Sequence, residues 1–286
     1  MADADGATDR VVERSLSTLW GLVRATHALP SLAVTAFFAA TAVAAGVGPR
    51  SALLAAAVLV GQASIGWAND YVDAPLDEAA GRRDKPIPTG AVRRGVVGAC
   101  AGAALIADVP LSLALGWRAG AAHVVAVGSA WHYDLWLKRT PASAVPFAVS
   151  FGLVPVIVAA MLPDEPLPRP TLVAAAAACG IAAHFSNTLP DVAADAMTGV
   201  RGLPQRLGPT VSTVVAATFV AAASVLLVVA TDAAALAVVA AVVDVAAAIV
   251  VVIRGRHREQ AFRLVIVAVA ILVVAFVLSG GHRLTG

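Results

Sequence analysis

The sequence predicts an all-α, polytopic membrane protein. Of its residues, 59% are hydrophobic and 13% are charged, and the mean hydropathy is +0.85. A soluble domain carries about 25% charged residues. The chain also contains nine apolar runs, each close to the roughly 20 residues that a helix needs to cross a bilayer. They lie at about 29–47, 51–68, 95–116, 119–135, 142–162, 171–190, 211–230, 233–253 and 262–280.

Residues 1–23 are more polar than the rest of the chain. They predict a polar cytoplasmic tail that leads into a short amphipathic segment at the membrane surface. The apolar residues of that segment are Val11, Val12, Leu16, Leu19, Trp20 and Val23. Residues 24–286 then predict one transmembrane domain, in which Ala and Gly allow close helix packing.

A polar stretch at 69–90 comes after the second apolar run. If the helix continues through it, Asn69, Asp73 and Asp77 share one face because they stand four residues apart, with Asp70 beside them. Carboxylates that converge at a membrane boundary repel each other unless a cation neutralises them. Oxygen ligands of this kind suit Mg²⁺, which is usually shared with substrate phosphates. The stretch therefore predicts a divalent metal that holds a phosphorylated ligand.

A second stretch repeats this pattern at the end of the sixth run. Asn187, Asp191 and Asp195 again stand four residues apart, and Arg201 comes after them as Lys85 comes after the first set. The two sets indicate an internal repeat of the site. Each stretch also contains a proline, Pro75 or Pro190, which predicts a kink or a helix end.

The loop after the fourth run reads Tyr133 to Arg139 and ends in Lys138 and Arg139. One interpretation is that both cations clamp phosphate oxygens. The other is that they only determine topology. The chain has two lysines, Lys85 and Lys138, and both fall in loops on the side of the aspartates.

The distribution of Lys and Arg predicts the orientation. With the N-terminus inside, 16 of the 20 fall in cytoplasmic segments, whereas Arg50, Arg118, Arg169 and Arg283 fall outside. Both aspartate stretches would then face the cytoplasm, and we expect a plasma membrane of bacterial type.

The remaining polar residues define no second motif. Asp108 and Asp244 lie within apolar runs, where an ionisable group is a functional candidate; Asp108 precedes Pro110 and a predicted helix break. His27, His123 and His184 lack metal-ligand spacing, so we expect them to be packed or hydrogen-bonded. The chain has no P-loop, HExxH or GxSxG pattern, which leaves soluble nucleotide and hydrolase chemistry unsupported.

Taken together, these motifs resemble the UbiA-type family of membrane polyprenyltransferases. The family's NDxxDxxxD pattern corresponds to Asn69, Asp70, Asp73 and Asp77, and its second DxxxD to Asp191 and Asp195. The loop from Tyr133 to Arg139 is similar to the family's YxxxLKR-like loop. The family's usual nine-helix bundle agrees with the nine runs. Gly202 stands where the family commonly has Thr or Ser.

The resemblance implies Mg²⁺-dependent transfer of an isoprenyl group from an allylic diphosphate to an aromatic or lipid acceptor in the membrane. It implies no nucleic-acid partner, and the oligomeric state is left open. Two alternatives remain, a membrane terpene cyclase of the same fold and an ion-coupled transporter. The implied metal and catalytic residues are Asp70, Asp73, Asp77, Asp191 and Asp195; the implied diphosphate contacts are Asn69, Lys85, Lys138, Arg139, Asn187 and Arg201.

Overall fold

The structure is a computed structural model that describes residues 15–189 and 199–230, with a few isolated positions after Ala230. The elements of this described part are all helices, which confirms the predicted fold class. A first helix, Ser15–Ala25, precedes α2. The others are α2 (Ala28–Ala44), α3 (Arg50–Ala79), α4 (Arg94–Leu113), α5 (Trp117–Leu135), the short 3-10 helix η1 (Leu137–Arg139), α6 (Val145–Ala159), α7 (Pro170–Thr188) and α9 (Leu203–Ala230).

These helices coincide with the first seven predicted apolar runs. Within the described residues, α3, α4 and α9 are long and apolar enough to cross a membrane by themselves. Ser15–Ala25 and α2, bent by 55°, would form a fourth span if taken together. The predicted runs at 233–253 and 262–280 lie outside the described residues, apart from isolated positions.

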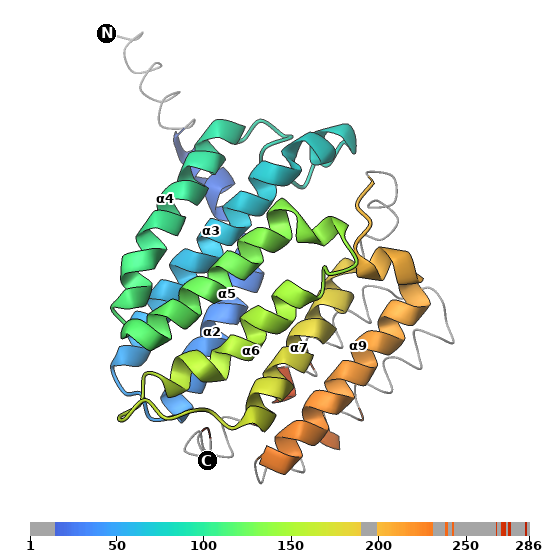
Figure 1. Ribbon diagram of the computed structural model, residues 1–286. Helices are drawn as coiled ribbons and strands as arrows, with labels where there is room; N and C mark the ends of the chain where they lie inside the picture. Colours follow the sequence, from blue (N-terminus) through green and yellow to red (C-terminus); the bar gives the residue numbers. More distant parts are fainter. Residues whose placement is uncertain are drawn as a thin grey trace.

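The helices run side by side in one bundle, with successive members antiparallel (Figure 1). α3 packs against α2, α4 and α5, while α7 packs against α6 and α9. The loops at 80–93, 136–144 and 199–202 lie at the upper end in Figure 1, which we call the site end. The C-termini of α3 and α5 and the N-terminus of α9 therefore meet there.

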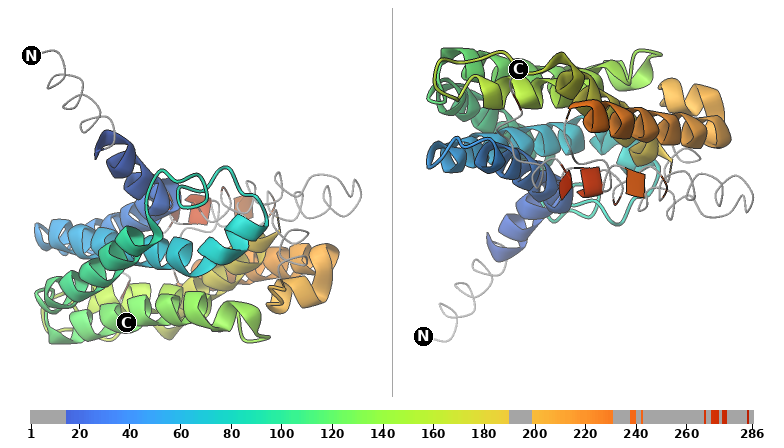
Figure 2. Two further views of the ribbon diagram at one scale, coloured as in Figure 1. Left: turned by 90° about the horizontal axis from the view of Figure 1, so that it is seen from above. Right: turned by 90° about the horizontal axis from the view of Figure 1, so that it is seen from below.

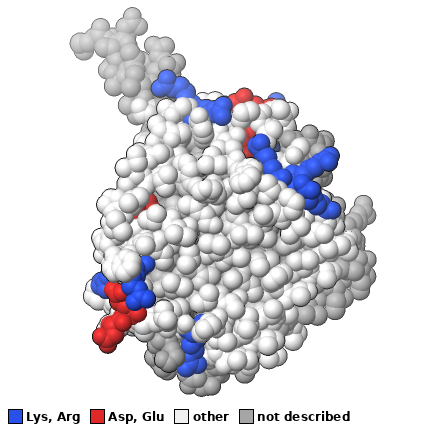
Figure 3. Space-filling view, in the orientation of Figure 1, with Lys and Arg blue, Asp and Glu red and all other residues white. Residues whose placement is uncertain are grey.

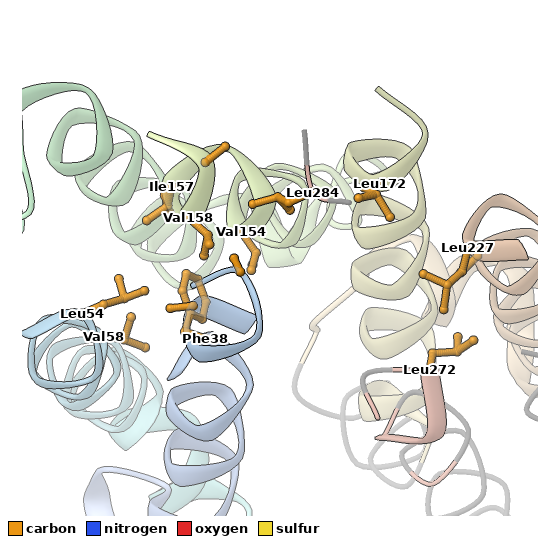
Figure 4. Packing of buried hydrophobic residues seen from close by; sticks show 14 of the residues in the cluster. Phe38, Leu54, Val58, Val154, Ile157, Val158, Leu172, Leu227, Leu272 and Leu284 are labelled. Atoms are coloured by element: carbon orange, nitrogen blue, oxygen red, sulfur yellow. The ribbon is translucent and has the colours of Figure 1, made fainter. Parts of the chain in front are cut away.

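Close packing holds the bundle together. Phe38, Leu54, Val58, Val154 and Ile157 gather where α2, α3 and α6 meet (Figure 4), and each is at most 6% exposed. In a bilayer the lipid tails are as apolar as these side chains, so helix association depends on close van der Waals contact. These side chains provide it together with small buried residues such as Ala42 and Ala57.

α3 contains the start of the first polar stretch, and it is longer than a bilayer core is thick. Its 30 residues span about 45 Å at 1.5 Å per residue, whereas the hydrocarbon core is about 30 Å thick. α3 is therefore about 15 Å longer than the core is thick. Of the two outcomes expected at Pro75, a kink or a helix end, the helix end was wrong, because α3 continues through Pro75 to Ala79. α4 likewise continues through Pro110, so Asp108 lies within a helix rather than at a break.

The surface matches that of an integral membrane protein. Charged side chains on the face in Figure 3 gather toward the two ends of the molecule, with a broad uncharged band between them. Exposed Ile106, Val125 and Val229 belong to the apolar helix surfaces. The Ser15–Ala25 helix leaves the bundle at an angle (Figure 2), and its Leu16, Leu19 and Trp20 are about 60% exposed, as an interfacial helix requires.

Candidate active site at the end of α3

The polar residues of the first stretch all lie in the last turns of α3. Because the helix continues to Ala79, Asn69, Asp73 and Asp77 stand one above the other along one side of it. Asp70, one position further round, is turned into the protein. Its side chain is 2% exposed, whereas that of Asp73 is 22% exposed.

Asp70 is paired with two positive or hydrogen-donating groups. Its Oδ1 accepts a hydrogen bond from Lys85 Nζ at 2.7 Å and another from His27 Nε2 at 2.9 Å. The two nitrogens are 3.3 Å apart because they share this oxygen. A carboxylate oxygen only accepts, so His27 carries a proton on Nε2. Lys85 therefore neutralises Asp70 inside the protein.

The loop after α3 brings Lys85 back over the helix end. The chain turns at Gly81, whose positive φ of 64° lies in the left-handed region that favours glycine. Arg82 then binds both carboxylate oxygens of Asp84, at 2.9 and 2.8 Å, and this pair lowers the pKa of Asp84 to about 2. Arg24 donates to the backbone oxygen of Asp84 at 2.6 Å. Asp84, the residue next to Lys85, is thus held through its side chain by Arg82 and through its backbone oxygen by Arg24.

His27 reaches the site through the bend that precedes α2. It occupies a left-handed conformation with φ 53° between Ser15–Ala25 and α2. Gly66 of α3 allows the bend to approach, since a Cβ at Gly66 would lie 2.5 Å from the backbone oxygen of Thr26. Trp67 Nε1 also donates to the backbone oxygen of Leu22 at 2.9 Å. The N-terminal segment is therefore part of the site.

A second pair of contacts joins α3 to the end of α5. Lys138 Nζ lies 2.6 Å from Asp73 Oδ1, and its side chain is only 7% exposed. One turn earlier on α3, Asn69 Nδ2 donates to Asp134 Oδ1 at 2.9 Å. Asp134 is 3% exposed, and within residues 15–189 and 199–230 its Oδ2 has no hydrogen-bond partner. Each of the chain's two lysines thus holds a different aspartate of α3.

η1 and the start of α9 fix the position of Lys138. A Cβ at Gly202 would lie 2.6 Å from the backbone oxygen of Lys138, so the 199–202 segment approaches η1 as closely as a glycine permits. Ser143 Oγ accepts the backbone N–H of Leu203 at 2.9 Å and also contacts His184 Nε2 at 2.9 Å. The chain just after the second aspartate stretch therefore lies against the first site.

The other predicted site residues are less constrained. Asp77 is partly buried, whereas Arg139, Asn187 and Arg201 are exposed. Asp191 and Asp195 lie outside the described residues. Among the residues that the structure does describe, no three acidic, histidine or cysteine side chains form a metal-binding group. Two of the α3 acids are instead held by lysines.

Comparison with known proteins identifies the family. The sequence profile of the UbiA prenyltransferase family matches residues 16–272, which is most of the chain. The protein belongs to this family. Among curated proteins it is similar to the bacteriochlorophyll synthase 33 kDa chain of Cereibacter sphaeroides, with 33% identity over 176 residues. That match covers 56% of this chain and 54% of the relative, so the chain spans about half the length of the curated relative it matches.

Solved UbiA structures share the fold. A UbiA homologue from Aeropyrum pernix K1 superposes with a TM-score of 0.69 at 20% identity, covering 85% of this chain and 97% of that one. A UbiA homologue from Archaeoglobus fulgidus, solved with GPP and Mg²⁺, superposes with a TM-score of 0.65 at 14% identity, covering 90% of this chain and 98% of that one.

The α3 end of this UbiA protein has the donor chemistry that magnesium prefers. The Asp73 carboxylate and the Asn69 amide oxygen are hard oxygen donors one helical turn apart. Lys138 already places a positive charge on Asp73, so this position accepts a cation. The residues therefore fit Mg²⁺, with Asp191 and Asp195 as the further acids that the sequence offers.

Sequence reasoning missed two residues of this UbiA site, His27 and Asp134. His27 was expected only to be packed or hydrogen-bonded, which is correct but did not place it on Asp70. The hydropathy pattern marks Asp134 only as the end of the fourth apolar run. Its position four residues before Lys138, hence near it at the end of a helix, was a signal that could have marked it.

Proposed function

We propose that this protein transfers an isoprenyl group from an allylic isoprenyl diphosphate to an acceptor embedded in the membrane, with Mg²⁺ as cofactor. One observation carries the proposal: the only two lysines of the chain both lie on the α3 acids, Lys85 on Asp70 and Lys138 on Asp73. Acids that are paired with ammonium groups at one end of an apolar bundle suit a metal–diphosphate ligand. The GPP and Mg²⁺ bound by the Archaeoglobus fulgidus homologue support the same ligand class.

The residues divide into two groups in this proposal. Magnesium would be held by Asp73, Asp77, Asp191 and Asp195. When bound, it would neutralise the charge that develops on the departing diphosphate. Asp70 belongs with these acids by sequence, but its hydrogen bonds to Lys85 and His27 support a different role, which is to hold the ammonium group in place. The diphosphate would contact Lys85, Lys138, Arg139, Asn187 and Arg201, whereas Asn69, which the sequence also assigned to the diphosphate, would offer its amide oxygen to the metal because its NH₂ group donates to Asp134.

The two lysines stabilise the negative charge that develops on the diphosphate when the allylic C–O bond breaks. The C–O bond between the allylic carbon and the diphosphate cleaves, and its electron pair leaves with the diphosphate oxygen. Lys85 and Lys138 donate hydrogen bonds that strengthen as this negative charge grows, which stabilises the transition state selectively. The allylic cation then bonds to the acceptor, which loses a proton. An apolar bundle excludes the water that would otherwise capture the cation.

The charge distribution supports the location. We propose that the N-terminus and the site end face the cytoplasm of a bacterial-type plasma membrane, because 16 of 20 basic residues fall on that side. The acceptor is an aromatic compound or a lipid, reached within the bilayer. The N-terminal helix Ser15–Ala25, whose bend carries His27, would lie at the same interface.

Diphosphate release by purified protein tests the proposal. The assay supplies geranyl, farnesyl or geranylgeranyl diphosphate with Mg²⁺, with and without a lipid extract of the native membrane. We expect release that depends on Mg²⁺ and on the extract, with a prenylated product detected by mass spectrometry. A terpene formed without any extract would make the protein a cyclase instead. Absence of release, with ion-coupled uptake in vesicles, would make it a transporter.

A further inference from the structure

Asp134 is a buried acid that the proposed reaction does not use. It is the second-last residue of α5 and is 3% exposed. Its Oδ1 accepts the hydrogen bond from Asn69, and its buried Oδ2 has no hydrogen-bond partner among the residues that the structure describes. An unsatisfied buried carboxylate oxygen is costly, so its retention needs a reason. The ionisable groups that act on Asp134 include Lys138, Asp73 and His27, which all belong to the site.

The contact with Asn69 settles which end of the amide faces which way. An asparagine side chain offers two N–H donors at one end and a carbonyl oxygen at the other. Asn69 Nδ2 donates to Asp134 Oδ1 at 2.9 Å, so the NH₂ group of Asn69 faces Asp134. The amide oxygen then points away from Asp134 and has no hydrogen-bond donor within the described part of the chain. Asn69 shares its side of α3 with Asp73 and Asp77.

The opposite orientation would oppose cation binding. With its NH₂ group turned toward the metal position, Asn69 would present hydrogen atoms of partial positive charge to a cation. With its oxygen there, it presents a neutral hard ligand to Mg²⁺ or to a water on it. The residue that fixes the amide therefore affects metal affinity without touching the metal, as partners of metal ligands commonly do.

We propose that Asp134 is a positioning residue, which holds the Asn69 amide with its oxygen toward the metal–diphosphate site. The proposal rests on the proposed function, because it assumes that a metal–diphosphate ligand binds at the end of α3. In this role, a hydrogen bond from α3 to α5 fixes the direction in which Asn69 presents its amide oxygen. Asp134 itself contacts neither the metal nor the diphosphate in this role.

The experiment measures metal-dependent binding rather than turnover. Detergent-purified protein is titrated with Mg²⁺ at fixed inorganic pyrophosphate, and the rise in the thermal unfolding temperature reports binding. In Asp134→Leu, we expect the Mg²⁺ concentration at half-effect to rise about tenfold, which corresponds to about 1.4 kcal/mol. In Asp134→Asn it should stay within about threefold of wild type, because the new amide oxygen can still accept from Asn69.

A double-mutant cycle separates positioning from a general structural role. If Asp134 acts through Asn69, the double variant Asn69→Ala with Asp134→Leu should bind no more weakly than Asn69→Ala alone. Effects that multiply would overturn the proposal, as would an Asp134→Leu variant that titrates like wild type. A wild-type protein that ignores Mg²⁺ and pyrophosphate would overturn the proposed function instead.

Exchanging the two residues, so that Asp stands at 69 and Asn at 134, provides a second test if Asp134→Leu folds poorly. Asn69→Asp alone places two carboxylates at a 2.9 Å contact and should weaken binding and stability. Adding Asp134→Asn restores a hydrogen bond in the reverse direction and should recover both. Failure to recover would contradict the proposal.

Asp108→Asn is the matched control. Asp108 is a buried acid on α4, 1% exposed, that accepts from Ser112 and lies beside Gly61 of α3. Gly61 precedes Asn69 by eight residues, or about 12 Å along the helix. This variant should lower the unfolding temperature without moving the Mg²⁺ titration; a shift as large as that of Asp134→Leu would count against a specific role for Asp134.

Discussion

The ammonium group of Lys138 lies 2.6 Å from Asp73 Oδ1, where the proposed reaction requires a metal ion. The lysine side chain is 7% exposed, so it is not a mobile surface cation. A metal that binds Asp73 Oδ1 competes with this ammonium group for the same oxygen. The displaced charge then needs a new partner, because an unpaired charge in a buried position is costly. The oxygens of a diphosphate would be that partner.

Mg²⁺ and diphosphate should therefore bind as a coupled pair. We expect each ligand to tighten the binding of the other by a factor between about 5 and 150, the usual range of such couplings. Calorimetric titration with Mg²⁺ alone, pyrophosphate alone and both together measures it. In Lys138→Met, Asp73 is free, so Mg²⁺ alone should bind more tightly and the coupling should fall.

Mg²⁺ and pyrophosphate also form a complex with each other in solution. Its contribution to the measured coupling is the same for wild type and Lys138→Met, so it cancels when the two proteins are compared. Arg83→Met, which removes an exposed cation from the loop after α3, should leave the coupling at its wild-type value. Equal coupling in wild type and Lys138→Met would contradict the exchange of Lys138 between Asp73 and the diphosphate.

The same substitution should affect mainly stability at Asp70 and mainly turnover at Asp73. Asp70 is 2% exposed and is held by Lys85, itself 15% exposed. Asp70→Asn removes one partner of a buried pair, which costs about 3–5 kcal/mol of stability. Asp73→Asn, at a partly exposed position, should abolish turnover with little loss of stability. Thermal unfolding and diphosphate release, measured on both variants, check this.

Metal removal completes that comparison. A chelator should stop turnover of the wild-type protein, and added Mg²⁺ should restore it. A fully active Asp73→Asn variant would refute the metal assignment, and an Asp70→Asn variant that unfolds like wild type would refute the anchoring role of Asp70.

The sequence predicted the parts of this site that depend on local spacing. Asn69, Asp73 and Asp77 share a side of α3 because they stand four residues apart on a continuous helix. Hydropathy placed the helices, since a bilayer requires long apolar segments. It did not place their ends. α3 continues past Pro75 because the backbone oxygen of Tyr71, which a proline at position 75 leaves without its helical donor, accepts a hydrogen bond from Arg94 Nε at 3.0 Å.

Contacts between distant segments could not be predicted. His27 meets Asp70 only because the chain bends in a left-handed conformation before α2. Asn69 meets Asp134 only because α3 and α5 are neighbours in the bundle, a matter of topology rather than periodicity. Which lysine pairs with which aspartate depends likewise on the folding of two loops.

The topology of the site end can be tested with two single cysteines. Arg83 and Leu167 are both exposed, and they lie in loops at opposite ends of the bundle, 80–93 and 160–169. In a background with Cys100 and Cys179 replaced, Arg83→Cys should be labelled by an impermeant thiol reagent only after the cytoplasmic side is opened. Leu167→Cys should be labelled in intact cells. Labelling of both from one side would refute the predicted orientation and the span count between them.

Gly202 should tolerate no side chain. A Cβ there would lie 2.6 Å from the backbone oxygen of Lys138, closer than a real Cβ contact allows. Gly202→Ala must therefore shift η1 and displace Lys138 from Asp73. We expect a stability loss of about 1–3 kcal/mol, the usual cost of overpacking, together with a raised KM for the allylic diphosphate. Gly95→Ala is the control, because a Cβ at Gly95 meets nothing within 4 Å; this variant should cost no stability and should leave the KM unchanged. A Gly202→Ala variant with a wild-type KM would show that the position of η1 does not govern diphosphate binding.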